Sequence, residues 1–128
     1  MDRILLLMTT TTYRAGAFLE AARRLSVLAV VGSDRPQVLE AANPAGHLTI
    51  DFGAPEEAAQ AIVAFARRVP MRAVTAADDD GVVLASRAAA ALGLPHNPVG
   101  AVAAARNKLQ MREVLAKAGL PSPRFAAF

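Results

Sequence analysis

The sequence predicts an α/β fold built on a parallel sheet. Short apolar runs alternate with helix-like stretches along most of the chain, and parallel strands require such crossover helices between them. The first run, residues 4–8, is apolar without a period, which is typical of a strand buried on both faces. The repeated strand–helix order predicts a Rossmann-like, doubly wound sheet of about four strands with helices on both faces.

The boundaries of the elements follow from periodicity and breaker residues. Strands are expected at residues 4–8, 26–31, 47–52 and 72–76. The first helix presents an apolar face over residues 17–25, and a short helix is expected from Pro36 to Ala42. Acids after Pro55 and arginines at residues 67–68 complement the dipole of a third helix. An alanine-rich helix over residues 82–92 is stopped by Gly93.

Composition excludes several classes of protein. The 128 residues are 54% hydrophobic and 20% charged, which indicates about one globular domain and excludes disorder. A net charge of +3, spread along the chain, is too small to indicate a nucleic acid partner. The absence of cysteine excludes disulfides and thiolate chemistry. The first apolar run is too short for a signal peptide or a membrane span, so we expect a cytoplasmic protein.

Ligands of open α/β sheets bind at the carboxyl ends of the strands, which directs attention to the loops that follow them. After the first strand, Thr12, Tyr13 and Arg14 supply a hydroxyl, a phenol and a guanidinium at a helix N-terminus. These groups could hold a carboxylate or a phosphate. An ordinary N-cap at Thr12 beside a solvated Arg14 is equally compatible with the sequence.

Acidic residues follow two other expected strands. Residues 78–80 place three carboxylates where a strand ends and a helix begins; they could bind a cation or an amine, but helix capping is favoured. Asp34 is favoured as a turn or cap residue, because no glycine-rich dinucleotide motif accompanies it. His47 and His96 have no partner at a metal-binding spacing, so no metal site is predicted. Because the chain has no cysteine and no serine in a nucleophile motif, no catalytic residue is predicted either.

Residues 99–120 form a further helical segment, and residues 121–128 read as a linker. Within the segment, Asn107 and Gln110 have the spacing of a capping box, which would start a new helix at Lys108. Lys108 would then lie at the positive end of the helix dipole, a placement that hints at an anionic ligand. An unbroken helix from Val99 would make Lys108 a solvated mid-helix residue, and spacing alone favours that alternative.

A family resemblance rests on the Asn107-Lys108 pair and on the Ala-Gly-Leu-Pro-Ser-Pro sequence at residues 118–123. With residues 76–79 and 92–97, these motifs resemble the N-terminal, or pre-ATP-grasp, domain of ATP-grasp enzymes over essentially the whole chain. Thr12-Tyr13-Arg14 and Asp51-Phe52 are most similar to L-amino acid ligases and related carboxylate–amine ligases. The expected organisation is a pre-ATP-grasp domain at residues 1–98, a connecting helical segment at 99–120, and a linker at 121–128 that begins an absent ATP-grasp lobe.

The resemblance implies an enzyme that activates a carboxylate as an acyl phosphate with Mg-ATP before an amine attacks it. It implies that Lys108 contacts the nucleotide phosphates and that the domain lines part of the substrate site, for which we expect Thr12, Tyr13, Arg14 and Asp79. The rest of the nucleotide site would follow Phe128, so this chain alone is expected neither to bind ATP tightly nor to catalyse.

The expected partner is a small-molecule carboxylate or amine. Neither a nucleic acid nor a membrane is expected as a partner, and the sequence is compatible with a homodimer. The alternative function is a free-standing binding or scaffold module for a small anionic metabolite or nucleotide.

Overall fold

The parallel sheet predicted from the sequence is present in the computed structural model, which describes residues 1–12, 14–35, 43 and 45–128. Within these residues, four parallel strands lie in the order β3-β2-β1-β4. They are β1 (Arg3–Leu7), β2 (Leu28–Ser33), β3 (His47–Thr49) and β4 (Ala73–Ala76). The α/β class is therefore confirmed, although β3 is shorter than expected. Tyr13 and the short helix expected from Pro36 to Ala42 lie outside the described residues.

Strand β1 lies inside the sheet, where Leu5 pairs with Val30 of β2 and with Val74 of β4. Leu5 and Leu7 belong to the core on one face of the sheet, and Leu6 packs into a second core on the other face. These three leucines are at most 2% exposed. Burial on both faces explains why the run shows no alternation of apolar and polar residues.

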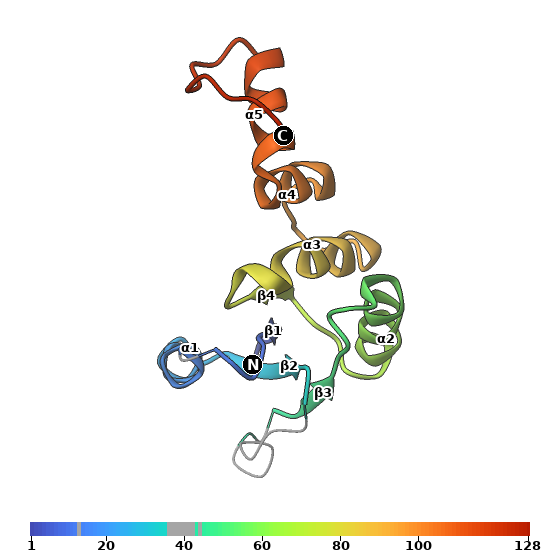
Figure 1. Cartoon of the computed structure of the whole chain (residues 1–128). Helices are drawn as coiled ribbons and strands as arrows, with labels where there is room; N and C mark the ends of the chain where they lie inside the picture. The colour runs from blue at the N-terminus through green and yellow to red at the C-terminus, as the bar shows by residue number, and fades with distance from the viewer. Residues whose placement is uncertain (13, 36–42, 44) are drawn as a thin grey trace.

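Helices cover both faces of the sheet (Figure 1). Helix α1 (Ala15–Arg24) packs on one face, and α2 (Pro55–Arg68) and α3 (Val82–Ala91) pack on the other. Helix α2 has acids in its first turn and arginines in its last, as its charge pattern predicted. Helix α3 ends at Gly93, whose positive φ of 66° lets the amide of Leu94 donate to the carbonyl of Ala89 at 2.9 Å.

A buried serine joins the edge strand β3 to β2. The Ser33 hydroxyl donates a hydrogen bond to the carbonyl of Arg35 at 2.7 Å, which leaves its oxygen to accept from Nε2 of His47 at 2.8 Å. Ser33 is fully buried, so this pair satisfies a polar group in the core. The contact gives His47 a structural role at the edge of the sheet.

The C-terminal segment consists of two helices, α4 (Val99–Arg106) and α5 (Lys108–Lys117), which lie beyond α3 (Figure 1). The unbroken helix favoured by spacing is therefore wrong, because the backbone of Asn107 is extended. The start of α4 is tied to α3 by the buried Ser86, whose hydroxyl donates to the carbonyl of Asn97 at 2.6 Å. Neither α4 nor α5 has a buried residue. None of the helices described here is long and apolar enough to cross a membrane.

Candidate functional site

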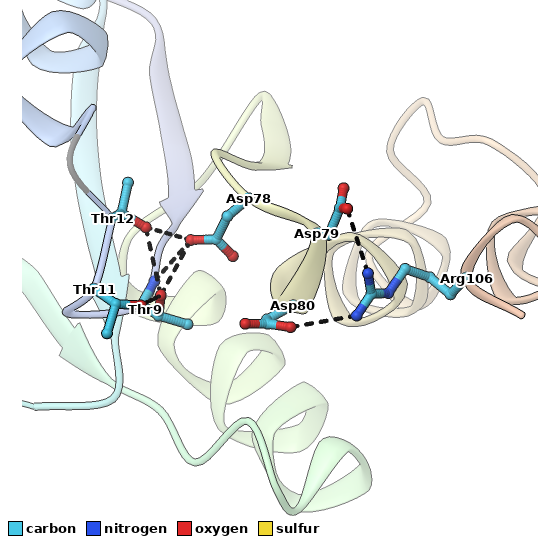
Figure 2. Close-up of polar contacts among 7 residues, drawn as sticks. All are labelled: Thr9, Thr11, Thr12, Asp78, Asp79, Asp80 and Arg106. Atoms are coloured by element: carbon cyan, nitrogen blue, oxygen red, sulfur yellow. Dashed lines mark hydrogen bonds and ion pairs between the residues drawn. The ribbon is translucent and has the colours of Figure 1, made fainter.

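The strand order creates a switch point between β1 and β4. The chain leaves β1 toward β2 on one side, and β4 flanks β1 on the other. Crevices at such points, outside the carboxyl ends of the strands, are where open α/β sheets bind ligands. Residues 9–12 follow β1, and residues 77–81 follow β4, so these two loops meet there. Figure 2 shows Thr9 and Thr12 of the first loop facing Asp78 of the second.

Asp78 ties the two loops together. Its Oδ2 accepts hydrogen bonds from the Thr9 amide at 3.1 Å, from the Thr9 hydroxyl at 3.3 Å and from the Thr12 hydroxyl. Partial burial acts to raise the pKa of this carboxyl, but the bonds from Thr12 and Thr9 outweigh it and hold the pKa below its ordinary value of 3.8. Asp78 is therefore ionised at neutral pH. Its Oδ1 is buried and has no hydrogen-bond partner in the described part of the chain.

A glycine lets the second loop close against the strand ends. Asp78 has an extended backbone and precedes a short 3-10 turn, η2 (Asp79–Gly81). Gly81 is buried, and a Cβ there would lie 3.0 Å from Cβ of Ala76 and 3.3 Å from Cβ of Leu7. Any larger residue would push η2 away from β1 and β4. The position of the acidic run therefore depends on Gly81.

Two more loops complete the carboxyl edge. Asp34, after β2, accepts bonds from the Thr10 amide at 2.8 Å and from the Thr10 hydroxyl at 3.2 Å. Asp51, after β3, accepts from the Gly53 amide at 2.8 Å. The loops surround a cavity of about 430 Å³ lined by Thr9, Asp34, Asp51, Phe52, Gly53, Asp80 and Arg106. Carboxylates dominate this wall, so the cavity favours a positively charged group over an anion.

Arg106, the last residue of α4, connects the C-terminal segment to this edge. Its guanidinium lies 3.4 Å from Oδ2 of Asp79 and 3.3 Å from Oδ1 of Asp80 (Figure 2). Asp79 is 85% exposed, so each ion pair alone adds little stability. The forked contact brings the end of α4 next to η2. Asp78 occupies the N-cap position of η2, and Asp79 and Asp80 lie in its first turn, where the helix dipole favours carboxylates, although neither η2 nor α3 has a side-chain cap hydrogen bond.

Asn107 starts the last helix. Its Oδ1 accepts a hydrogen bond from the Gln110 amide at 3.1 Å, which is the N-cap contact of a capping box. Lys108 is consequently the first residue of α5, and it is exposed. It lines a groove of about 1040 Å³ between β4 and α4, together with Asp79 and Arg106. The lysine expected to contact phosphate and an aspartate expected to contact substrate therefore share one groove.

The other expected site residues lie apart from this groove. Thr12 donates to Asp78 and does not cap α1, so the simple N-cap alternative is wrong. Arg14 occupies the N-cap position of α1 without a side-chain cap contact, and Tyr13 lies outside the described residues. Over the ranges 1–12, 14–35, 43 and 45–128, no group of three or more metal-ligating side chains could hold a metal ion.

Sequence reasoning missed the link made by Asp78 and the anchor made by Arg106. Threonines after one strand and aspartates after another were visible, but their contact depends on which strands are neighbours. Nothing local in the sequence indicates that the end of α4 lies against η2.

Comparison with known proteins places this arrangement in a family. The crystal structure of an L-amino acid ligase from Bacillus licheniformis matches with a TM-score of 0.84 at 21% identity, covering 100% of this chain and 33% of that one. A phosphoribosylglycinamide synthetase from Anaerococcus prevotii matches with a TM-score of 0.76 at 16% identity, covering 96% and 30%. The chain thus spans about a third of the length of these relatives, which share its fold.

No curated protein sequence matches the chain. A family model described as the ATP-grasp N-terminal domain matches residues 19–96, which is more than half of the chain. The chain therefore belongs to the ATP-grasp N-terminal domain family.

Proposed function

We propose that the chain is the N-terminal, substrate-side domain of an ATP-dependent carboxylate–amine ligase that works through an acyl phosphate. The observation that carries the proposal is the groove in which Lys108, at the start of α5, lies with Asp79 beside the switch point. The match to the ATP-grasp N-terminal domain supports the ligase class. The name of the Bacillus licheniformis relative supports an amino acid as one substrate.

Each expected site residue has a role in this proposal. Lys108 contacts nucleotide phosphate, because its ammonium group and the positive end of the α5 dipole both favour an anion. We assign substrate contacts to Asp79, Thr12, Tyr13 and Arg14, as the family resemblance implies. The acidic cavity next to Asp80 suits the ammonium group of an amine substrate. We place the protein in the cytoplasm, where such a ligase would find ATP.

ATP and Mg²⁺ belong to the complete enzyme in this proposal. The residues described here do not fit a full Mg-ATP site, because they offer Lys108 as a phosphate contact but no metal-binding group, and carboxylates line the nearby cavity. We therefore expect the 128-residue chain to bind Mg-ATP no more tightly than about 1 mM, or roughly 4 kcal/mol, by titration calorimetry. Micromolar binding would contradict this and favour the alternative, a free-standing nucleotide-binding module.

The decisive residue test is Lys108→Ala in the enzyme that joins this domain to a nucleotide-binding region. Loss of a charge-assisted contact to phosphate is expected to cost roughly 1.5–3 kcal/mol, seen as a tenfold or greater rise in the KM for ATP or fall in kcat. The thermal midpoint should not change, because Lys108 is exposed.

The matched control is Lys117→Ala at the other end of α5, which should leave ATP kinetics unchanged. Equal effects of the two substitutions, or none from either, would contradict the phosphate role. The reading frame after the codon for Phe128 is a second test: an in-frame ATP-grasp nucleotide-binding region is expected, and a stop codon would favour the free-standing module.

A further inference from the structure

The outer face of α2 carries a pattern that the proposed function does not use. A groove of about 670 Å³ lies between α2 and α3, and six side chains of α2 line it: Glu56, Ala59, Gln60, Val63, Ala64 and Arg67. Their spacing of three and four residues places them in one stripe along the helix. Arg87, Ala90 and Ala91 of α3 form the opposite wall, together with Val99 at the start of α4. Ala59 and Ala64 on one wall and two alanines of α3 on the other allow another helix to approach closely at these points.

The stripe is self-complementary about the midpoint of α2. When a second α2 lies antiparallel in the groove, Glu56 faces Arg67 of the partner subunit. Ala59 then faces Ala64 of the partner subunit, and Gln60 faces Val63 of the partner subunit. A two-fold axis repeats each of these contacts, as an isologous interface requires. The antiparallel arrangement also places opposite ends of the two helix dipoles together.

The charges at the two ends of the stripe are available for such contacts. Glu56 already pairs with Arg87 of α3, but its side chain is 72% exposed and its carboxylate can accept a second guanidinium. Arg67 is exposed and forms no ion pair within the described part of the chain. The Glu56 carboxylate and the Arg67 guanidinium are therefore both accessible to a second copy of the helix.

We propose that this groove holds α2 of a second copy of the chain, so that the protein forms a two-fold homodimer through antiparallel α2 helices. The contact is limited to α2, one side of α3 and the first residue of α4, which places it among small specific interfaces of less than about 1,200 Å². We therefore expect association in the micromolar range. This proposal is independent of the proposed function, because the groove lies away from Lys108 and the switch point.

Charge reversal tests the arrangement in the 128-residue chain. In sedimentation velocity over a concentration series, the parent chain should dimerise, and Arg67→Glu should weaken dimerisation at least tenfold because two glutamates then face each other. Glu56→Arg should do the same through two facing arginines. A mixture of the two variants should dimerise again, since each unlike pair then carries opposite charges.

The matched controls are Arg68→Glu and Glu57→Lys, which change neighbouring charges of α2 that do not line the groove. Both should leave dimerisation unchanged. A parent chain that stays monomeric at high concentration would overturn the proposal, and so would equal weakening by Arg68→Glu or a mixture that fails to associate.

Cross-linking gives a second measurement that does not depend on charge. The chain has no cysteine, so Gln60→Cys introduces a single thiol close to the proposed two-fold axis. A short bismaleimide should link this variant into a dimer, whereas Arg68→Cys should remain monomeric under the same conditions. Cross-linking at position 68 but not at position 60 would overturn the antiparallel arrangement. Circular dichroism of each variant checks that the helices are retained.

Discussion

The strands and helices up to α3 bury cores on both faces of the sheet, whereas α4 and α5 have no buried residue. Residues far apart in sequence stabilise the sheet, as when Leu5 pairs with both Val30 and Val74. The contacts described at the two ends of α5, by contrast, join residues that are close together in the sequence. Gly119, for example, has a positive φ of 71°, and the amide of Leu120 donates to the carbonyl of Leu115 at 3.0 Å, which ends α5.

The same contrast applies to the two groups of expected site residues. Thr12 is held by Asp78, across 66 residues of sequence, and its position requires the folded sheet. Lys108 is placed by the cap of Asn107 one residue earlier. Substitutions in the sheet should therefore change global stability, and substitutions in the C-terminal helices should change local order or function with little effect on unfolding.

The largest effect should come from truncating a central side chain of the sheet. Leu5→Ala removes a fully buried side chain and leaves a cavity, so we expect a loss of about 2–5 kcal/mol of unfolding free energy. Val114→Ala in α5, where the side chain is 56% exposed, should cost less than about 0.5 kcal/mol. Urea denaturation of both variants measures the difference, and similar losses would mean that the two regions are not stabilised differently.

A smaller effect is expected at the contact between the two switch-point loops. Asp78→Asn removes the charge that accepts bonds from Thr9 and Thr12, which should cost about 1–2 kcal/mol near neutral pH. Because folding lowers the pKa of Asp78, its contribution is present above the ordinary value of 3.8 and is lost as the pH falls through the folded pKa.

The stability difference between the parent chain and Asp78→Asn should therefore narrow below about pH 4. Chemical denaturation at a series of pH values measures it. Asp79→Asn, at a mostly exposed neighbour, is the matched control and should change stability little at any pH. If the parent chain and Asp78→Asn differ by the same unfolding free energy at every pH, including the most acid, the charge of Asp78 is not what links the loops.

The smallest global effect is expected at the junction of α4 and α5. Asn107→Ala removes the N-cap of α5, a change that costs about 1 kcal/mol of local helix stability. Amide hydrogen exchange should become faster in the first turn of α5, while the cooperative thermal midpoint stays the same. Asn107→Ser is the matched control, because a serine hydroxyl also caps helices. A lower midpoint for Asn107→Ala would mean that α5 contributes to the core.

The sequence was sufficient for features that depend on local pattern. The unbroken apolar run of β1, the charged ends of α2 and the glycine that ends α3 each predicted the observed element. The break at Asn107 was also encoded locally, in the spacing of Asn107 and Gln110, but the spacing of the whole segment favoured a continuous helix. The contacts of Asp78 with Thr12 and of Arg106 with Asp79 depend on strand order and helix packing, which the pattern of one sequence does not reveal.

The single residue between α4 and α5 has a geometric consequence. Arg106 holds the end of α4 against η2, whereas Lys108 already belongs to a helix with its own axis. Asn107 is the single residue between the two helices, so a rotation of its backbone torsions would change the angle between α4 and α5. Over a helix of ten residues, a few degrees at the junction move the far end by about an ångström. The direction of α5 relative to α4 can therefore change through the torsions of one residue.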